Sequence, residues 1–209
     1  MNKAVFLDRD GVINRKAPTE DQYITRWEDM EILPGVAEAI AELNQAGFQI
    51  IIVTNQRSVA KGLITIAELE SIHAQMCQHL ASAGATIRAI YYCPHEMEPP
   101  CSCRKPEPGM LLRAAQEHNI DLATSWMIGD SVKDVKAGQG AGCKTAQLID
   151  ENKLTGSSAD VVVSSLLAAV HKILEFEKNL GVTDLVDAQH AHRNKGRLDL
   201  GERLQVAKQ

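Results

Sequence analysis

Two aspartates directly after the apolar run Ala4–Leu7 are the first residues of this 209-residue chain that could do chemistry. Asp8 and Asp10 disfavour each other's ionisation unless a cation neutralises them. A hard divalent cation with oxygen ligands would do so, and Asp130 could supply a third carboxylate. Magnesium often bridges carboxylates to a substrate phosphate, so the pattern favours phosphoryl chemistry. The plain alternative is a strand end with solvated acids.

Two further segments carry groups suited to a phosphoryl oxygen. Thr54, Asn55 and Gln56 follow another apolar run and offer a hydroxyl, two amides and backbone N–H donors. Lys105 adds a positive charge that could neutralise both a nucleophile and a transferring group. Taken singly, these segments could equally be a polar turn and a solvated lysine.

A cluster of thiols and one imidazole immediately precedes this lysine. Its members are Cys93, His95, Cys101 and Cys103. Three thiolates and one imidazole match a closed, tetrahedral zinc site, whereas free reduced cysteines are the alternative. Because such a site has no open position, we expect zinc to be structural here and to pin the loop that carries Arg104 and Lys105. Cys77 and Cys143 lie outside this loop and are interpreted as buried small residues.

The elements that must position these residues alternate between apolar runs and helical periods. Strands are predicted near residues 4–7, 48–53, 87–92, 125–128, 144–149 and 160–163, and helices near 36–46, 69–83, 111–115, 132–137 and 166–174. Continuous apolar runs are typical of strands that are covered on both faces, as in a parallel sheet. The repeated βα units therefore predict a doubly wound α/β fold with a parallel sheet.

The predicted topology brings the candidate residues together. In open parallel sheets, ligands bind beyond the carboxyl ends of the strands. Asp8, Thr54 and Asp130 each follow a different predicted strand. We therefore expect these residues to meet at one edge of the sheet.

Composition restricts the class of protein. The net charge of −5 argues against a uniformly basic nucleic-acid binder, and 4% aromatic residues leave little for base stacking. No apolar run is long enough to span a bilayer, and the N-terminus lacks the apolar segment of a signal peptide. We therefore expect a cytoplasmic protein without a nucleic-acid or membrane partner.

The apolar periodicity weakens from Gly181 onward. Residues 1–180 are predicted to form one domain, and residues 181–209 a tail or a peripheral helix. The basic and histidine residues of this tail could bind a metal or an anionic partner, but we interpret them as a solvated tail. They are His190, His192, Arg193, Lys195 and Arg197.

Four segments together, FLDRDGV, IIVTNQ, CRKPEPGM and MIGDSVKD, resemble the haloacid dehalogenase superfamily of phosphohydrolases. The resemblance spans residues 3 to about 135 and implies a Rossmann-like fold. It implies that Asp8 is the nucleophile, that Asp10 is the general acid and base, and that Thr54 and Lys105 stabilise the phosphoryl group. Magnesium would be held by Asp8, Asp130 and the backbone carbonyl of Asp10.

Asp134 follows in the same segment, one helical turn after Asp130. It could support the magnesium site from outside the ligand shell. A carboxylate that stabilises the first turn of a helix is an equally good account.

The zinc loop beside CRKP is similar to one subgroup, the heptose-bisphosphate 7-phosphatases and the related histidinol-phosphate phosphatases. This subgroup lacks a cap domain, and the short intervals between the motifs leave no room for one. KPEPGM and YYCPH look like the heptose enzymes. This resemblance implies a magnesium-dependent phosphatase that hydrolyses the 7-phosphate of D-glycero-D-manno-heptose 1,7-bisphosphate in heptose biosynthesis. We also expect a monomer.

Substrate would be bound by the two arginines of these motifs and by their polar neighbours. Arg104 could meet the second, non-reacting phosphate through bidentate hydrogen bonds. The full expected set is Asn55, Gln56, Arg57, Arg104 and Lys105. Two departures from the heptose enzymes occur where substrate is chosen: Arg57-Ser58 replaces their usual Ser-Gly, and Gln22-Tyr23 replaces Gly-Tyr.

Three alternatives remain open. Histidinol phosphate would need carboxylates for its imidazolium, and Glu20, Asp21, Glu96 and Glu98 could supply them, although solvated loop acids are the plainer interpretation. Another small sugar phosphate is the second alternative. A zinc-stabilised binding module without catalysis is the third, but it would not need the intact catalytic set.

Overall fold

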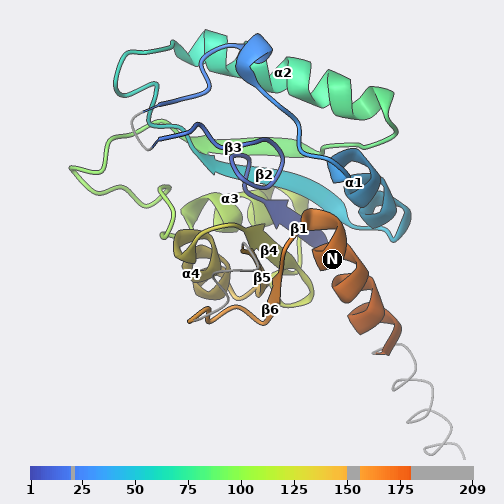
Figure 1. Ribbon diagram of the computed structural model, residues 1–209. Helices are drawn as coiled ribbons and strands as arrows, with labels where there is room; N and C mark the ends of the chain where they lie inside the picture. The colour runs from blue at the N-terminus through green and yellow to red at the C-terminus, as the bar shows by residue number, and fades with distance from the viewer. Residues whose placement is uncertain (20–21, 150–155, 180–209) are drawn as a thin grey trace, which may run out of the picture. The chain divides into compact units, whose positions relative to one another are not determined.

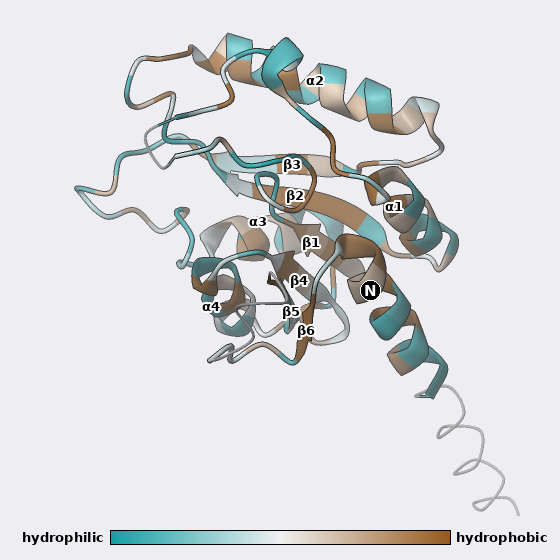
Figure 2. Ribbon diagram, viewed as in Figure 1, coloured by the Kyte–Doolittle hydropathy of each residue, from teal (hydrophilic) through white to brown (hydrophobic). Residues whose placement is uncertain are grey.

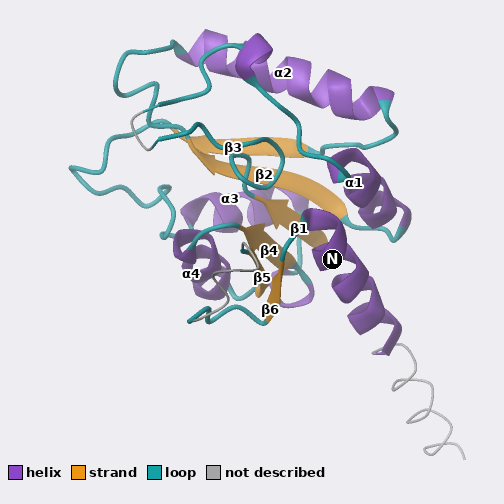
Figure 3. Cartoon of the chain, in the orientation of Figure 1, coloured by secondary structure: helices purple, strands orange, loops and turns teal. Residues whose placement is uncertain are grey.

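The computed structural model describes residues 1–19, 22–149 and 156–179, and its core is a six-stranded sheet (Figures 1 and 3). The strands are β1 (Ala4–Leu7), β2 (Gln49–Asn55), β3 (Ala89–Cys93), β4 (Trp126–Gly129), β5 (Lys144–Leu148) and β6 (Val161–Val163). Their order in the sheet is β3-β2-β1-β4-β5-β6, and every neighbouring pair is parallel. The predicted parallel α/β sheet is therefore confirmed.

Helices connect these strands as the sequence predicts. They are α1 (Val36–Gln45), α2 (Ile66–Ser82), α3 (Gly109–His118) and α4 (Val132–Ala141), with the short 3-10 helices η1 (Trp27–Asp29) and η2 (Leu122–Thr124) and a further helix at 166–179. Helix α2 begins at a capping box, in which the side chains of Thr65 and Glu68 each accept a hydrogen bond from the other's backbone N–H. The order of elements is that of repeated βα units.

Several boundaries differ from the prediction by a few residues, and the end of α4 has a clear physical reason. Helix α4 continues beyond the expected end at residue 137, because Gly138 lies inside it rather than ending it. A Cβ at this position would lie 2.6 Å from the Met127 Cβ and 2.8 Å from the Thr145 Cγ2. Gly138 therefore lets the helix approach the sheet closely, and Gly142, at φ 87°, ends it instead.

Helices cover both faces of the sheet, with α2 on one side and α3 with α4 on the other (Figure 1). Phe6, Ile51 and Met127 share a buried cluster with residues of α3 and α4. The alternate residues, such as Leu7 and Ile52, are also fully buried, and alternation along a strand points them to the opposite face. Apolar residues accordingly run along the central strands (Figure 2), and their burial on both faces confirms the doubly wound arrangement.

No separate cap domain is inserted among the described residues of the sheet domain. Between β1 and α1, residues 8–19 and 22–35 include η1 as their one helix, and the β3–α3 connection carries the cysteine-rich loop. The sequence prediction of a capless fold agrees with this arrangement.

The chain divides into two compact units, residues 1–170 and 171–209. The proposed boundary at residue 180 and the proposed tail at 181–209 fall on residues outside the described part of the chain. Among the described helices, none combines the length and apolar character needed to cross a membrane.

Candidate active site

The sheet topology gathers the predicted residues at one edge. β1 pairs with β2 on one side and with β4 on the other, so the carboxyl ends of all three strands are adjacent. Asp8 follows β1, Thr54 lies at the end of β2, and Asp130 follows β4. The backbone N–H of Asp8 donates to the Ile128 carbonyl at 3.0 Å, which joins the first and third of these ends directly. This position beside β1 is where the chain order of the sheet reverses and where ligands bind in such folds.

Three carboxylates meet there. Oxygen atoms of Asp8, Asp130 and Asp134 lie within 4.8 Å of one another. Oδ2 of Asp130 pairs with Lys16 Nζ at 2.5 Å, whereas its buried Oδ1 has no hydrogen-bond partner among the described residues. A Cβ on Gly11, which has a φ of +93°, would lie only 2.0 Å from Asp130 Oδ2, so a glycine is required beside this carboxylate.

The electrostatics of this cluster suit a bound cation. Burial raises the pKa of Asp8 to about 7, with Lys105 partly offsetting the effect. Burial also raises the pKa of Asp130, and Lys16 only partly opposes it. Two buried carboxylates that resist ionisation, one with an unpaired oxygen, fit the oxygen-rich donor set that a hard divalent cation prefers.

Lys105 is the positive centre of the site, and its side chain is only 2% exposed. Its Nζ lies 2.8 Å from Asp8 Oδ1 and 2.6 Å from Asp134 Oδ1, and it donates to the Val53 carbonyl at 2.7 Å. Burial would lower the pKa of Lys105, but the carboxylates of Asp8 and Asp134 outweigh it and raise the pKa. The lysine is therefore held charged, with all three of its donors in use.

The amide of Asn55 fixes the backbone of this lysine. Its Nδ2 donates to the Lys105 carbonyl at 3.0 Å, and its Oδ1 accepts from the Lys105 N–H at 3.1 Å. The sequence placed Asn55 among substrate-binding residues, whereas its side chain here positions Lys105. Both the N–H and the oxygen of the Asn55 amide bind the Lys105 backbone. Because Asn55 is the last residue of β2, this strand fixes the position of the lysine.

Asp134 caps α4, which is one of the two roles that the sequence left open, and it also pairs with Lys105. Its Oδ2 accepts from the Ser131 N–H at 3.0 Å and from the Ser131 hydroxyl at 2.6 Å, which caps α4. Its Oδ1 pairs with Lys105, and the residue is 1% exposed. Gly129 makes room for it, because a Cβ there would lie 2.1 Å from the Asp134 Cβ.

Replacing Asp134 tests this second role. In Asp134→Asn, Lys105 loses one of its two carboxylates, and we expect kcat to fall at least about 10-fold, since electrostatic positioning of this kind is worth several kcal/mol. Unfolding in urea should show a loss of about 1–3 kcal/mol, the range for a hydrogen bond to a charged group. Asp121→Asn is the matched control, because Asp121 caps η2 away from the site. Equal kcat in both variants would contradict the role.

The carboxylate of Asp10 is held by three neighbours. Arg9 donates to it at 2.9 Å, Asn14 Nδ2 at 2.9 Å, and Gln56 Nε2 at 2.9 Å. Burial raises the pKa of Asp10, but Arg9 and the hydrogen bonds from Asn14 and Gln56 outweigh it, and the pKa is lowered. Gln56 also donates to the Thr54 hydroxyl at 2.9 Å, which connects Asp10 to the end of β2.

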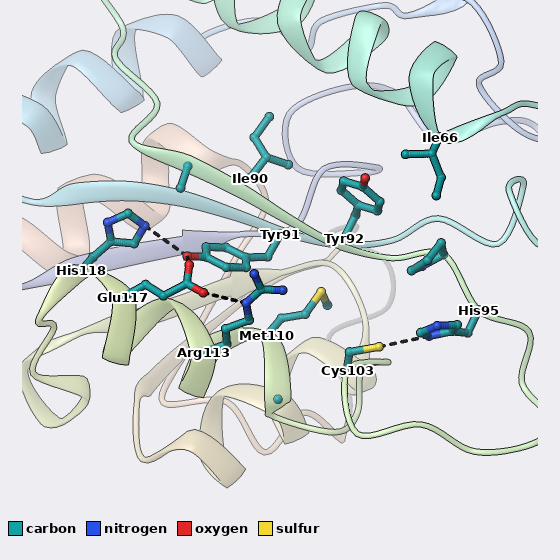
Figure 4. Close-up of a pocket in the computed structure, with 13 residues that line it drawn as sticks. Ile66, Ile90, Tyr91, Tyr92, His95, Cys103, Met110, Arg113, Glu117 and His118 are labelled. Carbon is teal, nitrogen blue, oxygen red and sulfur yellow. Dashed lines mark hydrogen bonds and ion pairs between the residues drawn. The ribbon is translucent and has the colours of Figure 1, made fainter.

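The four predicted zinc ligands form a compact cluster at the end of β3 and in the loop that follows it. Neighbouring ligand atoms lie 3.3 Å to 3.6 Å apart, and none of the sulfurs forms a disulfide. A tetrahedral zinc with Zn–S bonds of about 2.3 Å would separate its sulfurs by about 3.8 Å, so the cluster is compatible with zinc. Figure 4 shows Cys103 and His95 facing each other. Outside the cluster, Cys143 is buried as expected, but Cys77 is only half-buried.

The two candidate phosphate-binding arginines both contact this loop. Arg104 donates to the His95 carbonyl at 3.2 Å, and Arg57 Nε pairs with Glu96 Oε2 at 2.5 Å. Glu96, one of the acids considered for an imidazolium, is therefore already paired with Arg57. Two others, Glu20 and Asp21, lie outside the described residues.

Sequence reasoning missed three residues of this site. Arg9 stands between the two aspartates of the motif and is 1% exposed, and its NH1 lies 3.2 Å from His73 Nε2. Lys16 reaches Asp130 from the loop after β1. The position of Arg9 in DRDG could have drawn attention to it, but His73 lies among the apolar residues of α2 and gave no signal.

A groove of about 610 Å³ lies apart from these carboxylates, along the free edge of β3 (Figure 4). Its lining runs from His118, Glu117 and Arg113 on α3 to His95 and Cys103 of the cysteine-rich loop. None of the three clustered aspartates lines it. The clustered aspartates thus lie outside this groove.

Comparison with known proteins agrees with this geometry. A sequence model of haloacid dehalogenase-like hydrolases matches residues 2–142. The chain is 38% identical over 174 residues to D-glycero-beta-D-manno-heptose-1,7-bisphosphate 7-phosphatase of Escherichia coli K12, covering 78% of this chain and 89% of that protein. The same enzyme of Pseudomonas aeruginosa is 39% identical over 140 residues, covering 67% of this chain and 77% of that protein.

A solved structure is also similar. It is the D,D-heptose 1,7-bisphosphate phosphatase of B. bronchiseptica, complexed with magnesium and phosphate. It has a TM-score of 0.75 and 35% identity, and the match covers 83% of this chain and 98% of that one. The chain therefore belongs to the haloacid dehalogenase-like hydrolases, as the four motifs predict, and it is a phosphatase of that family.

Proposed function

We propose that this phosphatase hydrolyses the 7-phosphate of D-glycero-β-D-manno-heptose 1,7-bisphosphate through an aspartyl-phosphate intermediate. The observation that carries the chemistry is the Asp8 carboxylate, fixed by Lys105 at the end of β1. The substrate is supported by the relatives, which carry this activity in their names. The zinc-loop motif beside Lys105 supports the same subgroup.

The first half of the proposed reaction transfers the phosphoryl group to the protein. A carboxylate oxygen of Asp8 forms a bond to phosphorus while the bond from phosphorus to the sugar oxygen breaks. Asp10 donates a proton to that leaving oxygen. The backbone N–H of Arg9 donates to Asp8 Oδ1 at 2.7 Å, and Lys105 Nζ contacts the same oxygen. The Asp8 carboxylate is therefore held in one orientation.

The second half returns the protein to its starting state. Asp10, now ionised, accepts a proton from water as the water oxygen attacks phosphorus and the bond to Asp8 breaks. Its three hydrogen-bond donors and its lowered pKa favour this ionised form, which suits the base, whereas the acid of the first half requires Asp10 to be protonated before the transfer. The Thr54 hydroxyl accepts from Gln56, so its own proton can be donated to a phosphoryl oxygen.

Two metal ions complete the proposal. Magnesium would be held by Asp8, Asp130 and the backbone carbonyl of Asp10, and it would neutralise charge on the transferring phosphoryl group. Asp134 supports this site through Lys105. Zinc would be held by the four-residue cluster that ends at Cys103, two residues before Lys105, and would fix the position of that lysine.

The second phosphate of the substrate would be bound at the zinc-loop side of the site. Arg104 is anchored there by the His95 carbonyl, and its remaining donors can bind an anion. Arg57 would join it after exchanging Glu96 for phosphate. This departure from the Ser-Gly of the heptose enzymes therefore adds a cation where the non-reacting phosphate is expected.

Phosphate release from a defined set of substrates tests the proposal. With magnesium present, we expect kcat/KM for the β anomer of the heptose 1,7-bisphosphate to exceed that for histidinol phosphate and fructose 1,6-bisphosphate at least about 100-fold, which corresponds to about 2.7 kcal/mol. The α anomer is the closest control. A preference for histidinol phosphate would overturn the substrate, and no release from any of them would favour a silent binding module.

A further inference from the structure

We propose that Arg9 is a positioning residue, which holds the carboxylate of Asp10 in its working orientation and is itself fixed by His73 of α2. This inference rests on the proposed function, because it concerns how that reaction obtains its acid and base. The contacts of Arg9, its burial and the location of His73 carry the argument.

Arg9 offers its whole donor edge to one carboxylate. Its Nε lies 3.2 Å from Asp10 Oδ1, and its terminal NH2 nitrogen lies 2.9 Å from both oxygens of Asp10. The guanidinium is 1% exposed, so it cannot contribute to binding a substrate from solvent. A planar, bidentate contact of this kind restricts both the position and the rotation of a carboxylate.

The remaining terminal nitrogen of Arg9 contacts a different element. Its NH1 lies 3.2 Å from Nε2 of His73, a residue that is 4% exposed. An arginine can only donate, so Nε2 must be the acceptor and the imidazole must be neutral. Burial lowers the pKa of His73 to about 3, and the charge of Arg9 contributes to this, in agreement with a neutral ring.

His73 lies on α2, far along the chain from the loop that carries Arg9, so the contact between them joins two separate elements. This histidine lies one helical turn from both Leu69 and Met76, on the buried face of α2, and its ring centroid is 5.8 Å from that of Tyr92 on β3. A neutral polar ring in this apolar layer needs a partner, and Arg9 is that partner. The contact thus ties the loop after β1 to a rigid helix on the sheet face.

The expected consequence concerns the acid step rather than the nucleophile. The carboxylate of Asp10 must meet the leaving oxygen, and a displacement of about 1 Å can cost about 100-fold in rate. A leaving group that departs without a proton should be insensitive to this displacement. The sugar oxygen needs a proton, whereas p-nitrophenolate does not.

Single-turnover transfer from two substrates to the protein is the experiment. In Arg9→Met, we expect the transfer rate from the heptose bisphosphate to fall at least about 100-fold, the lower end of the usual range for acid catalysis, and the rate from p-nitrophenyl phosphate to fall less than about 5-fold. Arg26→Met is the matched control, because Arg26 forms an exposed pair with Asp29. A merely structural role for Arg9 would lower both rates by the same factor, and that result would overturn the proposal.

A second pair of variants covers the case in which Arg9→Met does not fold. His73→Leu removes the acceptor for Arg9, while His73→Gln keeps an oxygen that can accept. We expect His73→Leu to show the same selective loss at about 10-fold, and His73→Gln to recover most of it. Equal rates in the two His73 variants would overturn the inference. If the wild-type chain hydrolyses neither substrate, the proposed function fails instead, so the two failures are distinct.

Discussion

Asp8→Asn is expected to lower kcat for phosphate release by at least about 10⁴-fold, because an amide oxygen is a far weaker nucleophile than a carboxylate. The fold should survive, since Lys105 keeps its contacts with Asp134 and with the Val53 carbonyl. Rapid acid quenching with labelled substrate should trap about one phosphate per wild-type chain and none on the variant.

Asp29→Asn is the control for this variant. Asp29 is an exposed aspartate that pairs with Arg26 at 2.9 Å. It should release phosphate at the wild-type rate and form the same trapped intermediate. If Asp8→Asn kept more than about 1% of the activity, Asp8 would not be the nucleophile, and the reaction would need a different attacking group.

The fold could be predicted from the sequence because local pattern and global topology agree. Continuous apolar runs such as Ile50–Val53 indicated strands buried on both faces, and β2 is such a strand. Several element ends were misplaced by a few residues, among them the end of α4. A glycine there can end a helix or let it approach a neighbour closely, and only the packing of Met127 against Gly138 distinguishes the two.

The candidate site was predictable where chemistry and strand ends coincide. Asp8, Thr54 and Asp130 stand directly at or after strands, so topology alone brings them together. Lys105 lies in the loop between β3 and α3, and strand topology does not predict where a loop residue lies. Its sequence motif nevertheless identified it as a candidate. The structure adds what motifs omit, namely that the Asn55 amide holds the lysine backbone in place.

The contacts that sequence reasoning missed join residues that are far apart in the chain. His73 is separated from Arg9 by 64 positions in the chain, and no periodicity of α2 distinguishes it from a core residue. Glu96 was interpreted as a solvated acid, but it pairs with Arg57 across the site. Such contacts between distant loops and helices depend on the packed tertiary arrangement, which spacing along the chain does not contain.

Loss of the zinc cluster is expected to have the second large effect. In Cys101→Ala one of four ligands is removed, so the purified protein should contain much less than the about one zinc equivalent expected for the wild type. Lys105 follows Cys103 by two residues, and its displacement by about 1 Å would cost about 100-fold in kcat. The sheet should persist, because Cys101 lies in the loop between β3 and α3 and not in a strand.

Cys77→Ala separates this effect from the general loss of a thiol. Cys77 is half-buried on α2 and lies outside the cluster, so this variant should keep both the metal and the activity. Elemental analysis and phosphate release on the same preparations give the comparison. If Cys101→Ala lost zinc and kept full kcat, the Asn55 amide and the pairing with Asp8 and Asp134 would suffice to hold Lys105, and zinc would stabilise the loop without serving catalysis.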